Sequence, residues 1–452
     1  MKKSKGRRKI SVKRIVVLII ALCLISTAIL FLTRNNTKQS INKTDNVKLI
    51  TGTGNPGLIM SFAKNGSALL PTLSLNTNYL FVHTVRVGDV DNDKIEEIVA
   101  GISNSFFSEP YGCKVEEYST IDSQQNLSLI DDVGDVRCKD LAIGDADNDG
   151  KNEVLLGTHG EGYINLYKKI GGKWEKTVLE DNYIGKIDAE RNTTHKVARK
   201  DLTYDAVVNS AVHIVKIGDI DNDGKNEVVA TISSPLEFPS DEISFIRVYR
   251  YDKNLNSWNS STLDELHGRE FRSIAIGDLY GNGKNEMLIG IGTPGKNPGS
   301  VYLYSYDGSK WNKQLFYNDS IERNMKGLTI GDLDNDGKNE VVLATGFPNG
   351  VVHIFKWDEA KGKFSDNIIG RISDFFNLTG AEFNSMATEI GDFDSDSEKE
   401  IIVGGTTTFP EKKIGWEGAD SGYLVMFKRN KSGEWQGKIL DTHNILAVDA
   451  GK

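Results

Sequence analysis

The sequence predicts an all-β fold, a seven-bladed β-propeller with four-stranded blades, behind one N-terminal transmembrane helix. Three observations support the propeller: an acidic segment is repeated along the chain, apolar residues alternate beside it, and the two chain ends complete one further repeat. Four-stranded units arranged around an axis leave only short, protected sheet edges. A straight solenoid of the same units is the alternative, and the chain ends decide between the two.

The acidic segment occurs six times, each time between two apolar runs. In "IGDIDNDGKNEVVA", Ile217 to Ala230, three aspartates stand at alternate positions and are followed by a glycine and a glutamate. In the preceding "HIVKIGD", Val215 and Ile217 stand at alternate positions, which is typical of a β-strand. The copies are 54 to 74 residues apart, which suits about four strands with their turns. We number the acidic loops 1 to 6 by their first aspartates: Asp89, Asp145, Asp219, Asp278, Asp332 and Asp392.

The two ends of the chain resemble the two parts of one repeat. The C-terminal "THNILAVDAGK" resembles an inner strand and stops at the loop, while the segment from Val47 matches the strands after loop 5, from Val341. A closed ring gives a reason to divide one unit between the chain ends, and a solenoid gives none. We therefore expect one propeller domain over residues 45–452, whose seventh loop is broken between Asp449 and Asn46 and binds nothing.

The acidic loops have the form D-x-D-x-D-G-x-x-E and predict cation sites. Carboxylates at positions 1, 3, 5 and 9 and a backbone carbonyl at position 7 are hard oxygen ligands, which suit Ca²⁺ better than a softer metal. An EF-hand is excluded because position 12 is apolar and the flanks read as strands. The alternative is an exposed acidic turn that binds nothing. The expected ligands are Asp89, Asp91, Asp93, Glu97, Asp145, Asp147, Asp149, Glu153, Asp219, Asp221, Asp223, Glu227, Asp332, Asp334, Asp336, Glu340, Asp392, Asp394, Asp396 and Glu400.

Three loops depart from this form. Lys94 in loop 1 and Ser397 in loop 6 replace the glycine, although both loops keep their four acids. In loop 4, Tyr280 and Asn282 replace two aspartates. We therefore expect only a weak metal site there, made by Asp278, Asn282 and Glu286.

These motifs resemble the FG-GAP (VCBS-type) repeat of the integrin α-subunit head and of many extracellular bacterial and archaeal proteins. The resemblance covers about residues 45–452. It implies a seven-bladed propeller with structural Ca²⁺ in the loop between the first and second strands of a blade, on the face opposite the usual ligand face. Because the family includes adhesion heads, lectin-like modules and polysaccharide lyases, the resemblance alone does not fix an activity.

The N-terminus predicts a membrane anchor. Residues 1–14 are rich in Lys and Arg, and residues 15–32 form an uncharged stretch of eighteen residues that is apolar except at Ser26 and Thr27, just enough to span a hydrocarbon core. The positive-inside rule places residues 1–14 in the cytoplasm and the body outside it, after a linker over residues 33–44. The expected localisation is therefore the cell membrane, with a single pass. A cleaved signal peptide is the alternative.

The charge distribution limits the classes of possible binding partner, and the cysteine content limits the possible disulfides. Residues 1–40 contain ten Lys and Arg and no acids, so the remainder carries 44 basic against 63 acidic residues. A strongly acidic body argues against nucleic acid as a partner. Cys113 and Cys138 can form a disulfide in an oxidising compartment, or remain two separate buried thiols.

A set of basic residues stands six positions before the first aspartate of each repeat. We expect these side chains to lie beside the central axis, at the end of the ring away from the acidic loops. There they could form an anion-binding mouth for acidic sugars or carboxylates, a three-histidine transition-metal site, or simply a ring of hydrated strand starts. The set is His83, Lys139, His213, Arg272, Lys326 and His443, with Met386 at the corresponding place in the sixth repeat.

The predicted function is that of a membrane-anchored, calcium-stabilised module for binding or adhesion. The connections opposite the cation loops vary in length, as recognition loops on a rigid scaffold do. The expected ligand is an extracellular protein or a glycan. One alternative is a surface-attached polysaccharide lyase or related carbohydrate enzyme with its site in the central funnel. Another is a structural subunit of a larger envelope assembly that binds no small ligand. No catalytic motif is present in the sequence, which assigns no catalytic residue and favours binding over catalysis.

Overall fold

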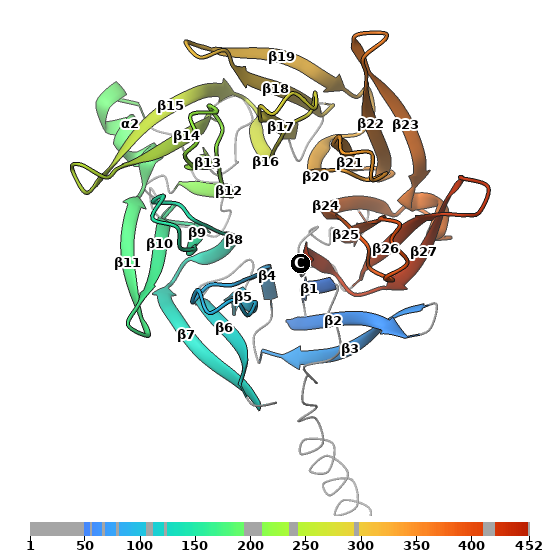
Figure 1. The fold of residues 1–452 in the computed structure, drawn as a ribbon, viewed down its shortest axis with the longest axis horizontal. Coiled ribbons are helices and arrows are strands. Elements are labelled where there is room, and N and C mark those ends of the chain that lie inside the picture. Colours follow the sequence, from blue (N-terminus) through green and yellow to red (C-terminus); the bar gives the residue numbers. More distant parts are fainter. Residues whose placement is uncertain are drawn as a thin grey trace, which may run out of the picture.

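The computed structural model describes residues 49–450, apart from 55–56, 66–67, 78–80, 105–111, 122–123, 194–209, 235–242, 293–297 and 410–420. These residues form an all-β, propeller-like body in which sheets surround a central axis (Figure 1). Among the described residues there are 28 strands, one α-helix, α2 (Tyr183–Arg191), and one 3-10 helix, η1 (Ile372–Phe375).

Three of the sheets have four antiparallel strands each. Neighbouring strands follow one another in the chain, except in the first sheet, where the last strand of the protein lies beside β1. The first sheet contains β28 (Ile445–Asp449), β1 (Leu49–Thr53), β2 (Leu58–Asn65) and β3 (Ala68–Asn76). The second contains β4 (Phe81–Gly88), β5 (Glu97–Ser103), β6 (Cys113–Ile121) and β7 (Gln124–Gly134). The third contains β16 (Glu270–Gly277), β17 (Glu286–Gly292), β18 (Ser300–Tyr306) and β19 (Trp311–Asn318).

Two further sheets have eight strands, and each consists of two four-stranded meanders. The meanders are joined through a single residue pair, His159 with Ala211 in one sheet and Gly346 with Asn384 in the other. The first contains β8 (Arg137–Gly144), β9 (Glu153–His159), β10 (Ile164–Ile170), β11 (Lys173–Glu180), β12 (Ala211–Gly218), β13 (Glu227–Ser233), β14 (Ile243–Asp252) and β15 (Ser257–His267). The second contains β20 (Asn324–Gly331), β21 (Glu340–Gly346), β22 (Val351–Asp358), β23 (Lys363–Arg371), β24 (Glu382–Gly391), β25 (Glu400–Thr408), β26 (Gly422–Arg429) and β27 (Trp435–Asp441).

The two ends of the described chain share one sheet. β28 pairs antiparallel with β1, so that Ile50 faces Asp449 and Thr51 faces Val448. In Figure 1 the red C-terminal strand lies beside the blue β1 near the axis. The expectation that the two ends complete a common unit, which no solenoid would require, agrees with this pairing.

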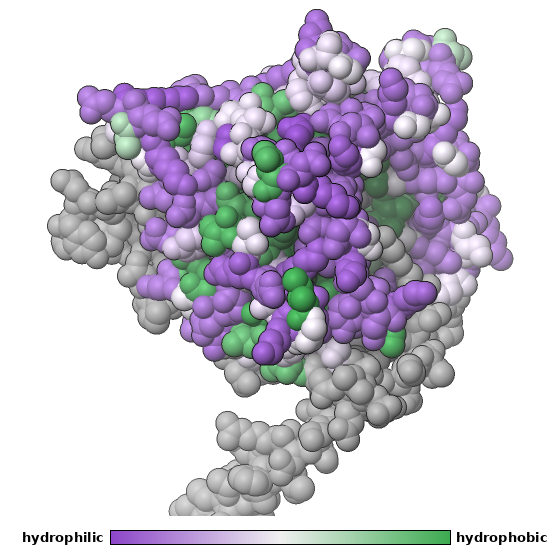
Figure 2. All heavy atoms as spheres, turned by 60° about the vertical axis from the view of Figure 1, so that its left-hand side comes forward, coloured by the Kyte–Doolittle hydropathy of each residue, from purple (hydrophilic) through white to green (hydrophobic). Residues whose placement is uncertain are grey.

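The core lies between adjacent sheets, and burial is greatest in the second strand of a meander and least in its outer strand. The second strands β13 and β17 are completely buried and the inner strand β12 is partly buried, whereas every position of the outer strand β23 is exposed or half-buried. This gradient matches the sequence, since the second strands read as unbroken apolar runs and the outer strands as mixed polar ones. The face shown in Figure 2 is accordingly mostly hydrophilic, with scattered apolar side chains.

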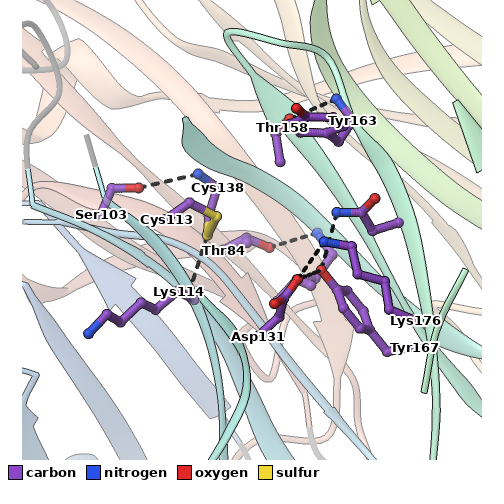
Figure 3. The surroundings of a disulfide bond; sticks show 12 residues. Thr84, Ser103, Cys113, Lys114, Asp131, Cys138, Thr158, Tyr163, Tyr167 and Lys176 are labelled. Atoms are coloured by element: carbon purple, nitrogen blue, oxygen red, sulfur yellow. Dashed lines mark hydrogen bonds and ion pairs between the residues drawn. A yellow bond between two sulfur atoms is a disulfide. The ribbon is translucent and has the colours of Figure 1, made fainter. Parts of the chain in front are cut away.

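A disulfide joins Cys113 of β6 to Cys138 of β8, and thus two neighbouring sheets (Figure 3). Of the two interpretations that the sequence allowed, the disulfide holds and the pair of free thiols does not. The same contact between sheets is reinforced farther out, where Tyr167 and Lys176 both donate to the Asp131 carboxylate of β7, at 2.7 and 2.8 Å.

The predicted membrane localisation needs correction. None of the helices in the described part of the chain is long and apolar enough to cross a membrane. The segments on which the prediction was based, residues 1–14, 15–32 and 33–44, lie outside the described residues. The expected single-pass membrane localisation is therefore withdrawn.

Candidate functional site

Five of the six acidic loops bring their carboxylates together. In each of these, one ligand atom from each of three acidic side chains lies within 4.8 Å of the other two. Among the described residues loop 4 forms no such group, in keeping with its Tyr280 and Asn282. The five groups are Asp89, Asp91 and Glu97; Asp145, Asp147 and Glu153; Asp219, Asp221 and Glu227; Asp332, Asp334 and Asp336; and Asp392, Asp394 and Glu400.

The first aspartate of each loop fixes the turn. The Asp219 carboxylate accepts hydrogen bonds from the backbone N–H groups of Asp223 and Gly224, at 3.1 and 3.0 Å. Asn222 and Gly224 have φ values of 61° and 86°, a backbone conformation that asparagine and glycine adopt most readily. Asp278 of loop 4 holds its turn with equivalent bonds of 3.1 and 2.6 Å. The turn therefore forms whether or not the remaining acids are present.

Asparagines at positions 4 and 8 join neighbouring loops, a role that sequence reasoning missed. The backbone N–H of Asn226 in loop 3 donates to Asn148 Oδ1 of loop 2 at 2.7 Å, and its side-chain amide donates to the Asp145 carbonyl at 2.8 Å. In return, the Asn226 carbonyl accepts from the Asn148 side-chain amide at 3.0 Å. Asn285 of loop 4 repeats both bonds towards loop 3, with Asn222 and Asp219. The repeated "DNDGKNE" contains the signal, because these asparagines keep fixed positions.

The glutamate at position 9 is buried against the loop. In loop 2, Glu153 Oε2 accepts the N–H of Ala146 at 2.9 Å, while its Oε1 is buried and accepts no hydrogen bond. Glu340 and Glu400 repeat the arrangement in loops 5 and 6. Burial raises the pKa of Glu400 to about 7, and the neighbouring Asp394 contributes to the increase. A cation near these buried oxygens would therefore compensate their charge.

A basic residue of the third strand of the meander supplies such a cation in four loops. Tyr167 pairs with Val154, so Lys168 comes opposite Glu153, and its ammonium lies 2.5 Å from Asp147, 2.7 Å from Asp149 and 3.0 Å from Glu153. The equivalent residues are Arg250 in loop 3, Lys356 in loop 5 and Lys428 in loop 6. In loops 1 and 4 the register places Ser119 and Ser305 there instead.

The residues present fit a hard divalent cation. The donor set is made of carboxylates, and Asp394 Oδ1 and Glu400 Oε1 are buried, point into loop 6 and accept no hydrogen bond. The same carboxylates contact the Lys428 ammonium, at 2.5 Å for Asp394 Oδ2 and 3.1 Å for Glu400 Oε1. A metal ion would therefore bind the same oxygens that this lysine contacts.

A cavity of about 120 Å³ lies on the axis, between the inner strands of the sheets. This volume exceeds what a single ordered water needs. The cavity has two layers of polar side chains: a mouth layer near the beginnings of the inner strands, and an axial layer nearer the acidic loops. His83, Lys139, His213 and Lys326 contribute to the mouth layer.

Each inner strand has a β-bulge at the mouth layer. The register between β4 and β5 shifts at His83, and the other inner strands shift at the corresponding residue. A bulge re-aims side chains, and here two consecutive residues, such as His83 and Thr84, both line the cavity. Within the described residues the shifts occur at His83, Lys139, His213, Arg272, Lys326, Met386 and Leu446.

One of the predicted mouth residues is not where the sequence placed it, and a second lies at the mouth layer without lining the cavity. His443 lies away from the cavity with 44% of its side chain exposed, and its Nδ1 contacts Asp441 at 2.6 Å. Leu446 takes its place, packed against Phe81 and Met386. Arg272 is buried beside the cavity rather than lining it, 2.5 Å from Glu270. The three-histidine metal site is therefore wrong, since His443 is absent from it.

Several cationic side chains surround the two histidines of the mouth layer. Burial lowers the pKa of His83 well below 6.5, and the nearby cations Lys139, Arg137 and Lys326 lower it further. Burial also lowers the pKa of His213 to about 4. Both imidazoles are therefore neutral at pH 7, and the positive charge comes from the lysines and arginines around them.

The axial layer is an ion network that the sequence did not reveal. Arg86 Nη2 lies 2.7 Å from Asp140 Oδ1, and Lys216, Glu389 and Asp449 line the cavity around this pair. Burial and the neighbouring Asp449 raise the pKa of Glu389 to about 7. Asp449 accepts the N–H of Val87 at 2.6 Å, so it belongs to the axis and not to a broken seventh loop.

Comparisons with known proteins find similarity in part of the chain. No family model matches it. KICSTOR complex protein ITFG2 of Bos taurus is 25% identical over 171 residues, which are 35% of this chain and 28% of that protein. The protein of the same name from Mus musculus is 25% identical over 159 residues, 32% of this chain and 31% of its own length. The match thus spans less than a third of either relative.

Several solved structures have a similar fold. The periplasmic gluconolactonase of Pseudomonas aeruginosa has a TM-score of 0.52 at 13% identity, over 88% of this chain and 96% of that chain. A putative 6-phosphogluconolactonase of Bacteroides fragilis NCTC 9343 has 0.52 at 13%, over 91% and 99%. A hypothetical selenium-binding protein of Sulfolobus tokodaii has 0.53 at 12%, over 91% and 95%. At such identities the likeness concerns the fold alone, and it supports a propeller-like body.

Proposed function

We propose that the protein is a seven-bladed propeller of the FG-GAP type that binds a carboxylate-bearing ligand at the mouth of its central cavity. Counting each four-stranded meander as one blade gives seven units around the axis, with the shared sheet of β28, β1, β2 and β3 as the closing blade. The acidic loops stabilise the ring at the other end of the inner strands by binding Ca²⁺.

The single observation that carries the binding role is the cationic mouth layer. Lys139 and Lys326 line the cavity, in a body whose remaining charge is strongly acidic. Phe81, Met386 and Leu446 form an apolar cluster beside them. One side of the opening is thus positive and another apolar, which suits a ligand that combines a carboxylate with a less polar ring face, such as an acidic glycan. An acidic protein side chain is the second ligand of this chemistry.

The test is a binding titration with acidic and neutral oligosaccharides of equal length, using the whole chain in the presence of Ca²⁺. We expect the acidic series to bind and the neutral one to bind more weakly. Lys139→Gln and Lys326→Gln should each lower the affinity at least about tenfold, the loss of one charge-assisted contact. Lys361→Gln is the matched control, because this lysine is exposed and pairs with Asp358 of its own turn. Equal binding of both series would refute the proposal.

A second candidate is a carbohydrate-active enzyme with its site in the same cavity. The observation that favours it is the pair Glu389 and Asp449, whose pKa values are both raised by burial. Two carboxyl groups of raised pKa in one cavity are suited to general acid–base catalysis. Turnover of an acidic polysaccharide by the wild type, lost in Glu389→Gln and in Asp449→Asn, would favour the enzyme. Binding without turnover would favour the binding module.

A further inference from the structure

The basic residue opposite the glutamate of an acidic loop has no assigned role. We propose that Lys168, Lys356 and Lys428 are built-in counter-ions, which neutralise loops 2, 5 and 6 without metal and leave when a divalent cation binds. Each of these loops then exchanges an ammonium group for a metal ion. The exchange rests on the proposed Ca²⁺ binding, whereas the neutralising role of the lysines does not.

The geometry of the three lysines is repeated independently. The Lys356 ammonium lies 2.6 Å from Asp334, 2.8 Å from Asp336 and 3.0 Å from Glu340. Lys428 contacts the carboxylates at the same three loop positions at 2.5, 2.5 and 3.1 Å, and Lys168 does so at 2.5, 2.7 and 3.0 Å. Each lysine thus holds the carboxylates of positions 3, 5 and 9, which are three of the four expected metal ligands.

The buried oxygens show that the lysine satisfies the loop only in part. Glu153 and Glu400 are completely buried, and the Oε1 atom of each accepts no hydrogen bond, although the ammonium lies near it. One positive charge faces four carboxylates in each loop. A divalent ion with oxygen coordination would satisfy these atoms more completely. Because lysine is a point charge on a flexible four-carbon stem, its ammonium can swing out to water without moving the strand.

Loop 1 provides the internal comparison. It keeps four acids, but its own meander places Ser119 opposite Glu97. An ammonium group from the next sheet reaches loop 1: Lys169 lies 3.4 Å from Asp91 and closer, at 2.8 Å, to Glu117. A divalent ion in loop 1 therefore displaces no ammonium of its own meander. We expect loop 1 to bind Ca²⁺ more tightly than loops 2, 5 and 6.

The experiment uses Lys168→Met in the whole chain, since methionine keeps much of the stem and removes the charge. In EDTA, the variant should melt several degrees below the wild type, because three carboxylates lose their counter-ion. In saturating Ca²⁺ the difference should vanish, and calorimetric titration should show an affinity of loop 2 raised about tenfold. Lys151→Met is the matched control: Lys151 belongs to the same loop, but its side chain is exposed, so only a general charge effect is expected.

Each possible result of this experiment supports or contradicts a stated part of the proposal. Unchanged melting of Lys168→Met in EDTA would overturn the counter-ion role. Equal destabilisation in EDTA and in Ca²⁺ would overturn the exchange and leave a permanent ion pair. A wild type that binds no Ca²⁺ would refute the proposed calcium role, while the EDTA comparison still tests the lysine. If Lys168→Met does not fold, Ser119→Lys serves instead: it should raise the melting temperature in EDTA and weaken Ca²⁺ binding at loop 1, and the opposite result would contradict the proposal.

Discussion

Replacing Asp140 by alanine should destabilise the ring more than any surface substitution, because this one carboxylate connects three inner strands. Asp140 belongs to β8. Its Oδ1 lies 2.7 Å from Arg86 Nη2 of β4, and its Oδ2 accepts the N–H of Val215 in β12 at 3.0 Å. The side chains of Asp140 and Arg86 are only 7% and 18% exposed, so solvent does not replace these contacts readily.

Two losses add up in Asp140→Ala. Removing one partner of a buried ion pair costs about 3–5 kcal/mol, since the remaining charge stays buried. Leaving the Val215 N–H without an acceptor costs about 1–3 kcal/mol. The two terms overlap, and a water molecule can enter the enlarged cavity, so we expect the free energy of unfolding to fall by about 4 kcal/mol.

Urea titration followed by circular dichroism measures this change. A double-mutant cycle with Arg86→Met isolates the pair: because Arg86 has lost its partner in Asp140→Ala, its removal should then cost far less than in the wild type. Asp358→Ala is the control, since its ion pair with Lys361 joins two residues of one exposed turn and should contribute little to stability. A loss below about 1 kcal/mol for Asp140→Ala would refute the argument that the axial network holds the strands together.

Three further outcomes follow from the same contacts. Burial raises the pKa of Glu389 to about 7, so the native chain keeps a proton that the unfolded chain has already released above about pH 4.5. The free energy of unfolding should therefore fall as the pH rises from about 5 to 7. Thermal melts of Glu389→Gln should show a flatter pH dependence. Chelation should lower the melting temperature. In Ca²⁺, Asp219→Ala should lower it more than Asp278→Ala. Because both aspartates hold their turns with the same backbone hydrogen bonds, equal losses would contradict a role for the ion. Reduction of the Cys113–Cys138 disulfide, which closes a loop of 25 residues, should lower the free energy of unfolding by about 3 kcal/mol in urea titrations, and no change would mean that strand pairing alone holds these sheets.

The repeat made most of the architecture predictable. Alternating apolar residues before each acidic loop and unbroken apolar runs after it indicate the first two strands of every unit, and the structure has strands there, such as β12 and β13. The loop acids were predictable for the same reason: a fixed spacing in a tight turn brings carboxylates together whatever surrounds them. The local sequence pattern was therefore sufficient to predict most of the fold and the acidic loops.

Contacts between distant segments could not be read in the same way. Lys168 is fifteen residues beyond Glu153 in the chain, and only the register of β10 against β9 places its ammonium among the loop acids. The axial network brings together Arg86, Lys216 and Glu389 from three different sheets. No spacing in the sequence marks such groups, because their proximity depends on closing the ring.

The closing strand shows why pattern matching fails where the repeat is incomplete. An alignment by its aspartate places Asp449 at the start of a seventh loop and His443 at the mouth, whereas the bulge of β28 falls at Leu446. The structural register brings Leu446 against Phe81 and Met386 and lets Asp449 accept the N–H of Val87 among the charges of the axial layer. The alternative would bury His443 in this apolar cluster and leave the axial cations Arg86 and Lys216 with one carboxylate fewer. Burial of an apolar side chain and compensation of axial charge therefore decide the register of the strand that closes the ring.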